Sequence, residues 1–186
     1  MADDFQGPAP ALETARLSLG PLRSEDAENV FAFGSDAEVT RYVFWPRHTT
    51  VENSRGFVAW LNGVKFLTWA VRQRGQSQVV GIVFLHSLNA RHQKAELSFH
   101  MARSCWGQGF ATEAATAVLR HALGPMKLHR IEGTCMVPNV ASARVLAKLG
   151  LIQEGLSRQS HQRAGEFFDM KLFAMLASDL PPATSP

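Results

Sequence analysis

Two glycines mark the stretch of the chain where residue types and spacing suggest chemistry. The segment Trp106-Gly107-Gln108-Gly109-Phe110-Ala111 joins a run with strand character to an alanine-rich run with helical spacing. Glycine lets the backbone turn tightly and approach a ligand closely. The free N–H groups at the start of the following helix, together with the helix dipole, then attract an anion. The pattern predicts a phosphate or pyrophosphate site, although a lone Gly-x-Gly also fits a tight turn that packs a helix on a strand.

Two well-known phosphate loops are excluded. No Gly-x-x-x-x-Gly-Lys-Ser/Thr occurs, and the sixth position counted from Gly107 is Thr112 rather than glycine, so the dinucleotide fingerprint is also absent. A Rossmann unit needs a parallel strand before the turn, whereas the strand here closes a predicted antiparallel meander.

The hydrophobic pattern predicts the elements that must position this turn. We expect strands within residues 12–22, 67–74, 78–86, 94–102, 130–137, 151–158 and 166–175. We expect one helix capped by Ser24, one opened by a capping box from Thr49 to Glu52, and two more over residues 111–123 and 139–149. The order β-α-α-β-β-β-α-β-α-β-β predicts an α/β fold with a mixed, partly antiparallel sheet.

The composition is that of one globular domain. Of 186 residues, 46% are hydrophobic, and 19 Lys and Arg stand against 16 Asp and Glu for a net charge of +3, short of a strongly basic nucleic-acid protein. The 2 cysteines and 7 histidines form neither a disulfide framework nor a metal motif. No signal segment or membrane-spanning run occurs. We expect a cytoplasmic monomer or homodimer without nucleic-acid or membrane partner: a flexible tail over 1–10, one domain over 11–178 and a tail over 179–186.

Several motifs in order resemble one known superfamily. They are residues 12–17, Glu96, and residues 106–114, 128–132, 138–142 and 145–150. They are similar to the GCN5-related N-acetyltransferase (GNAT) superfamily, and within it to the RimJ/RimL-type ribosomal-protein N-terminal acetyltransferases. The resemblance runs from about Leu12 to Leu176. It implies a GNAT-like α/β fold: a mixed, largely antiparallel sheet of about seven strands, four flanking helices, and a splayed strand pair that holds the cofactor.

The resemblance implies acetyl-CoA as the acetyl donor and no metal. The donor's pyrophosphate is expected on the backbone of Gly107, Gln108, Gly109, Phe110, Ala111 and Thr112. Its pantetheine arm is expected along the backbone at Met101 and Arg103, in the gap between the splayed strands. Asn139 is expected to contact the cofactor as well, although Asn at this place also caps a helix. The superfamily signature begins with Gln or Arg where this chain has Trp106, which puts a side-chain contact in doubt but not the backbone cradle.

Glu96 and Ser142 are the candidate catalytic residues. Glu96 stands in an otherwise apolar strand, where a carboxylate can take a proton from an amine directly or through water; the alternative is a half-exposed strand glutamate. His100, four positions further on the same strand, is a weaker candidate base. In RimL-type enzymes a serine at the place of Ser142 is the proposed donor to the leaving thiolate. Many other members use a tyrosine there, but the only tyrosine here is Tyr42.

The acceptor cleft is expected between the first two helices and the closing strands. Phe44, Trp45 and His48 would line one side and His161 the other, although these aromatic residues also suit a lid over the core. The predicted function is an acetyl-CoA-dependent N-acetyltransferase that acts on a primary amine, foremost a protein or peptide N-terminus. The alternatives are an acetyltransferase for small amines (antibiotics, polyamines or amino acids) and an inactive CoA-binding module.

Overall fold

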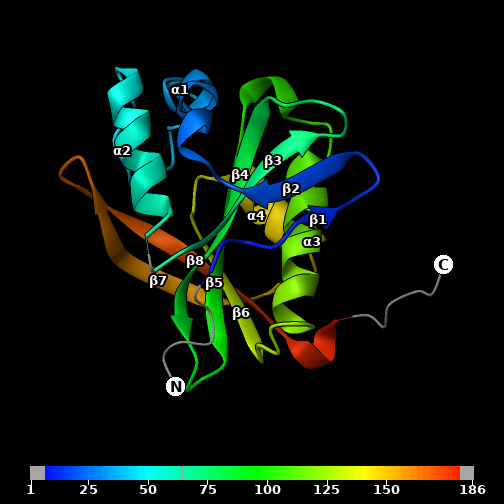
Figure 1. The fold of residues 1–186 in the computed structure, drawn as a ribbon. Coiled ribbons are helices and arrows are strands. Elements are labelled where there is room, and N and C mark those ends of the chain that lie inside the picture. The colour runs from blue at the N-terminus through cyan, green and yellow to red at the C-terminus, as the bar shows by residue number, and fades with distance from the viewer. Residues whose placement is uncertain (1–6, 64, 181–186) are drawn as a thin grey trace.

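A computed structural model describes residues 7–63 and 65–180 of the chain. In this part, one sheet of eight strands has the order β1-β2-β3-β4-β5-β6-β8-β7 (Figure 1). The strands are β1 (Leu12–Glu13), β2 (Leu17–Pro21), β3 (Leu67–Gln73), β4 (Val79–Asn89), β5 (Lys94–Met101), β6 (Arg130–Met136), β7 (Ile152–Arg163) and β8 (Glu166–Leu176). The helices are α1 (Ala27–Gly34), α2 (Val51–Leu61), α3 (Phe110–Leu123) and α4 (Val140–Lys148), with short 3₁₀ turns at Ser24–Asp26, Arg103–Cys105 and Ala177–Asp179.

The predicted order of helices and strands is confirmed, with one strand more than expected. The chain reverses between Thr14 and Leu17, whose backbone groups bond at 3.0 Å. The Thr14 hydroxyl also donates to the Leu17 carbonyl. This turn divides the single strand predicted over residues 12–22 into β1 and β2, which pair antiparallel. The predicted meander of β3, β4 and β5 is also confirmed, since both pairs are antiparallel.

Two predicted helix starts were wrong in detail. Ser24 does not cap α1, because residues 24–26 form a 3₁₀ turn in which the Asp26 carboxylate accepts from the Arg23 N–H at 2.9 Å. The capping box of α2 lies one residue later than predicted. Thr50 is the N-cap, and the side chain of Asn53 rather than Glu52 accepts from the Thr50 N–H at 3.1 Å.

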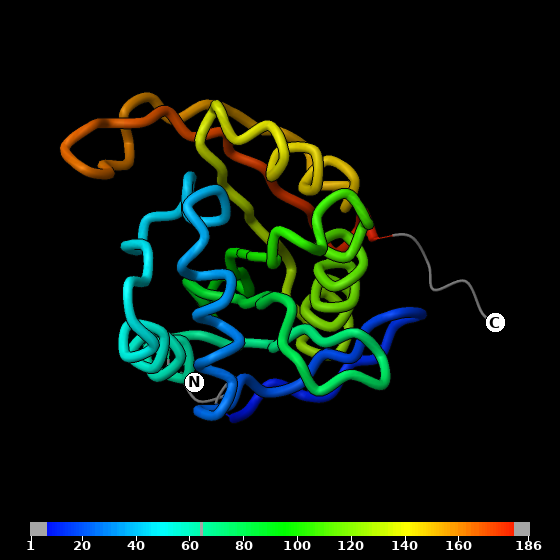
Figure 2. Tube along the Cα trace, turned by 90° about the horizontal axis from the view of Figure 1, so that it is seen from above, coloured from blue at the N-terminus to red at the C-terminus, as the bar shows by residue number. Residues whose placement is uncertain are grey.

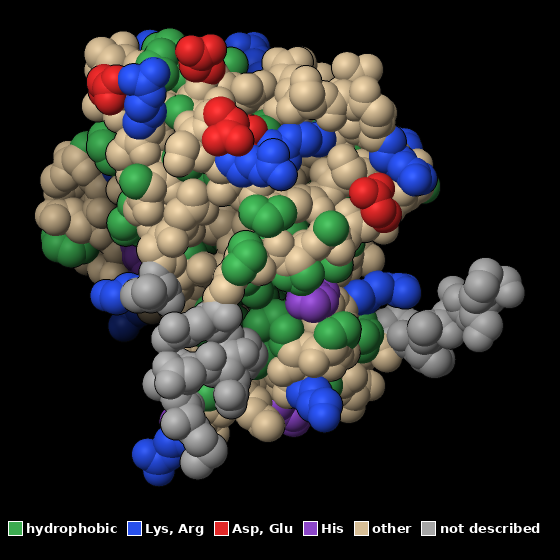
Figure 3. Space-filling view, viewed as in Figure 1, with side chains coloured by type: hydrophobic (Ala, Val, Ile, Leu, Met, Phe, Trp, Pro, Cys, Tyr) green, Lys and Arg blue, Asp and Glu red, His purple; other side chains and the backbone are tan. Residues whose placement is uncertain are grey.

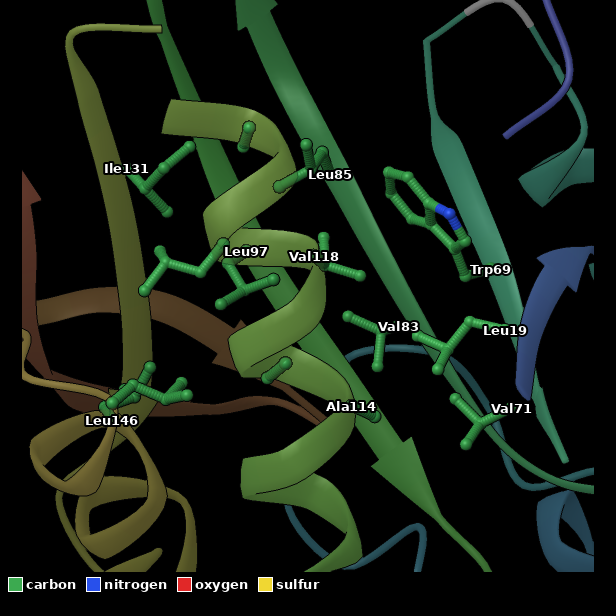
Figure 4. Close-up of a cluster of buried hydrophobic side chains, with 14 of the residues drawn as sticks. Leu19, Trp69, Val71, Val83, Leu85, Leu97, Ala114, Val118, Ile131 and Leu146 are labelled. Carbon is green, nitrogen blue, oxygen red and sulfur yellow. The ribbon is translucent and has the colours of Figure 1, made fainter. Parts of the chain in front are cut away.

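Each face of the sheet packs against its own pair of helices. Side chains on opposite faces alternate along a strand, so in β4 Val83 and Leu85 belong to one core while Ile82 and Phe84 belong to the other. Figure 4 shows the first core, where α3 lies across the sheet with Ala114 and Val118 turned toward the strands. The second core joins the sheet to α1 and α2.

The strands β5 and β6 part halfway along their length. They are parallel and pair only over Lys94–Glu96 and Arg130–Glu132. Beyond that point β5 stays with β4 as far as the Gly81–Met101 pair, and β6 stays with β8 as far as Met136–Met170. The predicted splayed strand pair is therefore present, and its opening faces the end of the sheet where the Gly107–Gly109 turn lies.

The long hairpin of β7 and β8 projects beyond the rest of the sheet. Seen from above, it extends on the side of the molecule that carries α1 and α2 (Figure 2). On the face drawn in Figure 3, acidic and basic side chains lie next to one another. No helix in the described residues is long and apolar enough to cross a membrane.

The N-terminal boundary of the packed region lies earlier than expected. Ala9 is 4% exposed, and the Pro10 carbonyl accepts a hydrogen bond of 2.8 Å from the Trp69 indole. Ala9 therefore joins the core and the exposed Pro10 is bonded to it, although we expected both residues in the tail. Of the two expected tails, residues 1–6 and 181–186 lie outside the described residues.

Candidate active site

The predicted phosphate loop has the backbone conformation that an anion site needs. Gly107 and Gly109 have φ values of +73° and +80°, in the left-handed region that favours glycine. Gly109 is the N-cap of α3, and the Glu113 N–H makes the first helical hydrogen bond, to the Gly109 carbonyl at 2.9 Å. The amides of Phe110, Ala111 and Thr112 precede that bond and therefore point out of the helix end. Binding of the donor's pyrophosphate by these amides stays a prediction.

Sequence reasoning missed an arginine that supports this loop. The guanidinium of Arg16 donates to the Gln108 carbonyl at 3.0 Å, pairs with the Glu113 carboxylate at 2.6 Å, and lies 4.7 Å above the Phe110 ring. Burial raises the pKa of Glu113, but hydrogen bonds from Thr14 and Arg16 outweigh it and lower that pKa overall. The carboxylate is thus ionised, and Arg16 balances its charge beside the anion site. Arg16 lies in the 12–17 motif, and this motif is the feature of the sequence that could have identified it.

Trp106 replaces the polar side chain of the superfamily signature with a structural contact. Its indole N–H donates to the Met101 carbonyl at 3.0 Å, and its own backbone N–H donates to the Arg103 carbonyl at 3.1 Å. The indole bond occupies one lone pair of the Met101 carbonyl, where we expected pantetheine to pair. A carbonyl oxygen has two lone pairs, so the second can still accept a hydrogen bond. Cofactor contacts at Met101 and Arg103 stay predictions.

Asn139 and Ser142 meet at the start of α4. The Asn139 side-chain oxygen accepts from the Ser142 N–H at 3.1 Å, so Asn139 does cap this helix. Its amide N–H groups stay free to donate, and a cofactor contact stays a prediction. Burial raises the pKa of the nearby Cys135 thiol, although Lys171 and Ser142 oppose that shift.

Glu96 lies at the point where β5 and β6 part. It forms the last register pair with Glu132, and its Oε1 accepts a hydrogen bond of 2.7 Å from the Thr134 hydroxyl on β6. Its Oε2 lies 4.0 Å from Nδ1 of His86 on β4, a residue that sequence reasoning also missed. The Glu96 side chain is 23% exposed. The predicted base is thus partly exposed at the point where the two strands part.

His100 is a poor base in this setting. Its ring packs against Trp45 and Phe84, with centroid distances of 5.7 and 5.8 Å. Burial lowers its pKa to about 4, so the imidazole is uncharged at neutral pH. Burial therefore makes His100 a weaker base than an ordinary histidine, and the role of Glu96 as base stays a prediction.

The two predicted sides of the acceptor cleft touch each other. The rings of Phe44 and His161 lie 4.9 Å apart. Nearby, the Arg163 guanidinium donates to the carbonyls of Thr40 and Arg41 at 3.0 and 2.8 Å. The hairpin of β7 and β8 is thereby attached to the segment between α1 and α2. Substrate contacts at Phe44 and His161 stay predictions.

Trp45 and His48 form the wall behind this contact. Their rings lie 4.9 Å apart, and the Trp45 indole N–H is buried without a hydrogen-bond partner among the described residues. His48 is only 3% exposed, and its Nδ1 bonds the Ser54 hydroxyl at 2.8 Å. A Cβ at Gly34 would come within 2.6 Å of that Nδ1. His48 thus supports Trp45 from the interior, and contact of either residue with an acceptor stays a prediction.

Metal ligands do not gather in the part of the chain that the structure describes. Nowhere in residues 7–63 and 65–180 do three His, Cys, Asp or Glu side chains lie in a position to hold an ion.

Comparison with known proteins identifies one family along most of the chain. The family model described as an acetyltransferase (GNAT) domain matches residues 16–152. The uncharacterized N-acetyltransferase YoaA of Bacillus subtilis (strain 168) is 30% identical over 171 residues, which are 90% of this chain and 97% of that protein. The crystal structure of an acetyltransferase (GNAT family) from Bacillus anthracis has a TM-score of 0.84 at 30% identity, covering 91% of this chain and 99% of that one.

Other relatives have names that state what they act on or bind. The ribosomal-protein-serine acetyltransferase of Escherichia coli (strain K12) is 25% identical, over 54% of this chain and 56% of that protein. The FsC-acetyl coenzyme A-N(2)-transacetylase of Aspergillus fumigatus is 31% identical, over 76% of this chain and 65% of that protein. Mycobacterium smegmatis RimJ, solved in complex with CoA-disulfide, shares the fold at 23% identity and a TM-score of 0.81, over 96% of this chain and 91% of that one. The chain therefore belongs to the GNAT family and is an acetyl-CoA-dependent N-acetyltransferase.

Proposed function

We propose that the acceptor is the α-amine of a peptide or protein N-terminus and that it attacks the donor directly in a ternary complex. The position of Glu96 carries the proposal. A carboxylate held by Thr134 at the point where β5 and β6 part lies at the inner end of the gap in which the family places its donor. There it can take the proton of an incoming amine.

Acetyl-CoA, when bound, supplies an activated acetyl group as a thioester. The loop amides of Phe110, Ala111 and Thr112 hold its pyrophosphate in this proposal. Beyond Glu96, the edge of β5 that faces β6 has no partner strand, and in this proposal it offers N–H groups to the thioester oxygen. Ser142 faces the departing sulfur. Because a thiol has a pKa near 8.5, the thiolate leaves without strong help, and Ser142 orients the sulfur more than it protonates it.

The chemistry of the base favours an α-amine over a lysine side chain. An α-amine with a pKa near 7.8 is about 14% neutral at pH 7, whereas a lysine amine near 10.4 is about 0.04% neutral. A carboxylate is a weak base and is better matched to the α-amine. The similarity to a ribosomal-protein-serine acetyltransferase supports the same acceptor class.

A matched peptide panel tests the proposal. One hexapeptide begins with a free serine, and a second has the same sequence with its N-terminus blocked and one internal lysine. We expect acetyl-CoA to release free thiol with the first and not with the second. Turnover of the blocked lysine peptide, or of neither peptide, would contradict the proposed acceptor.

A small amine is the second candidate acceptor. The observation in its favour is the 31% identity to a transacetylase whose name gives FsC, and not a ribosomal protein, as what it acts on. Spermidine, an aminoglycoside and free amino acids therefore belong in the same panel, and turnover of one of them alone would select this candidate. Calorimetry with acetyl-CoA completes the test, since tight binding without thiol release from any amine indicates an inactive CoA-binding module.

A further inference from the structure

We propose that His86 contacts the acceptor, forming with Glu96 a two-point site for a primary ammonium group. The inference rests on the proposed function, since it takes Glu96 as the group that receives the amine. His86 and Glu96 are register partners on β4 and β5, so their side chains leave the same face of the sheet. Each side chain is 23% exposed, and the space between them opens to solvent.

The distance between the two side chains suits an ammonium ion better than a direct bond. Nδ1 of His86 and Oε2 of Glu96 are 4.0 Å apart, too far for a hydrogen bond. An ammonium nitrogen that donates two hydrogen bonds of about 2.8 Å at a tetrahedral angle holds its acceptors about 4.5 Å apart. A primary ammonium has three such N–H donors, so one amine can bridge both groups.

Among the described residues, Oε2 of Glu96 has no hydrogen bond, and Nδ1 of His86 has one, with the exposed Ser87 hydroxyl. Oε1 of Glu96 is bonded to Thr134. Nε2 of His86 lies 3.0 Å from the Ser98 hydroxyl. With its proton on Nε2 and donated to Ser98, the imidazole presents its one lone pair at Nδ1, to which the Ser87 hydroxyl donates at 3.1 Å. An ammonium bound at Nδ1 therefore takes the place of this exposed hydroxyl.

Neighbouring charges do not take the place of the acceptor. Glu132, the register partner of Glu96 on β6, is paired with Lys94 at 3.0 Å and Arg130 at 2.9 Å. Burial against Phe66 and Phe84 lowers the pKa of His86, although the Glu96 carboxylate opposes that shift. A neutral imidazole accepts a hydrogen bond, whereas an imidazolium would repel the ammonium.

The backbone is irregular beside His86. The register of β4 and β5 shifts between His86 and Asn89, and Ser87 has a φ of +52°. A non-glycine residue in the left-handed region is strained, and bulges redirect side chains at the ends of ladders. The irregularity places the Ser87 hydroxyl against Nδ1 and ends the regular pairing at the His86–Glu96 pair.

Two variants separate the two nitrogens of His86. The side-chain amide of Asn reaches the position of Nδ1, and that of Gln reaches the position of Nε2. We expect His86→Gln to raise the KM for the serine-initiated hexapeptide about tenfold, the loss of one hydrogen bond to a charged group, with the KM for acetyl-CoA unchanged. We expect His86→Asn to stay within about threefold of the wild type.

Both His86→Gln and His86→Asn lose the imidazole ring that packs on Phe66 and Phe84. A loss of stability common to both variants therefore does not affect the comparison between them. Ser98→Ala, which removes only the partner of Nε2, is the matched control and should keep most of the peptide affinity. Equal peptide KM values for His86→Gln and His86→Asn would overturn the inference, as would a matching change in the KM for acetyl-CoA. A wild-type enzyme that acetylates none of the amines in the panel would instead refute the proposed function.

Discussion

The Thr134 hydroxyl donates a hydrogen bond of 2.7 Å to Oε1 of Glu96, across the point where β6 leaves β5. The last backbone pair between these strands is Glu96–Glu132. Thr134 lies two residues further along β6, on the same face as Glu132. This side-chain hydrogen bond thus joins β5 and β6 just beyond their last backbone pair, and it orients the Glu96 carboxylate toward the gap.

Removing the Thr134 hydroxyl should slow catalysis without affecting the cofactor. Thr134→Val keeps the shape of the side chain but frees Oε1 of Glu96, so the carboxylate loses its orientation. A hydrogen bond to a charged group contributes about 1.5–3 kcal/mol, and we expect kcat to fall about tenfold. Thr116→Val on α3, whose hydroxyl bonds the Thr112 carbonyl, is the control. Steady-state kinetics with an unchanged kcat for Thr134→Val would contradict the orienting role.

Neutralising Glu96 should have a larger effect. We expect Glu96→Gln to lower kcat by about 10²–10⁴, the usual contribution of a positioned general base, and to leave the Kd for acetyl-CoA unchanged in calorimetry. Glu132→Gln is the matched control, because it removes the same charge from the register partner of Glu96. The role of Glu96 as base fails if both variants lose activity to the same degree.

The variant Gly107→Ala tests whether the backbone conformation of the phosphate loop is needed for acetyl-CoA binding. An added Cβ there meets no heavy atom within 4 Å, but φ is +73°, so Gly107→Ala is opposed by conformation at a cost of about 1–2 kcal/mol. We expect weaker acetyl-CoA binding in calorimetry, because relief of that strain turns the loop amides away. Gly56→Ala, at an exposed position of α2 with equally free space, should instead raise stability by about 1 kcal/mol. An unchanged Kd for Gly107→Ala would remove the loop from the binding site.

Local patterns predicted most of the fold. The apolar spacing in α3 and the apolar runs of β3 and β4 depend on neighbours along the chain, so the element order followed from local patterns. The capping box of α2 was placed one residue early because Thr49 and Thr50 are both good caps. Only the packed structure decides that Asn53 completes the box.

The candidate site was predictable where its residues lie in one motif. The Gly107–Gly109 turn and Asn139 with Ser142 are local, and Glu96 stands out in an apolar strand. Arg16 and Glu113 are 97 residues apart, so no local pattern pairs them. His86 is one of seven scattered histidines, and only the register of β4 with β5 and the irregularity at Ser87 bring it to Glu96.

Arg163 should influence the acceptor more than the cofactor. Its guanidinium bonds the Thr40 and Arg41 carbonyls and attaches the β7–β8 hairpin to the α1–α2 segment. Arg163→Ala removes this attachment beside the Phe44–His161 contact. We expect the KM for the acceptor to rise several-fold, with the KM for acetyl-CoA constant. Arg158→Ala, an exposed arginine of the same strand, should change neither value, and equal kinetics for the two variants would argue against the hairpin as a wall of the acceptor site.

Stability should fall as the pH drops toward 4, and His100 should account for part of the loss. Its folded pKa of about 4 lies below the unfolded value of 6.5, so between these values the unfolded chain binds more protons. The free energy of unfolding therefore decreases as the pH falls from about 6.5 to 4, and this contribution levels off below 4. For a fully buried imidazole, this pKa difference corresponds to about 3 kcal/mol. Because His100 is only partly buried, we expect the free energy of unfolding to decrease by about 1–3 kcal/mol.

Urea unfolding of His100→Gln at pH 7 and pH 4.5 isolates this contribution. Burial also lowers the pKa values of His48 and His121, which act in the same direction, so the informative quantity is the difference in pH dependence between wild type and variant. We expect the variant to lose less stability than the wild type over this range, even if it is less stable at pH 7. His92→Gln, which replaces an exposed histidine, should keep the wild-type pH dependence. If His100→Gln keeps it too, the imidazole of His100 is not neutral by burial, and its exclusion as a base has to be reconsidered.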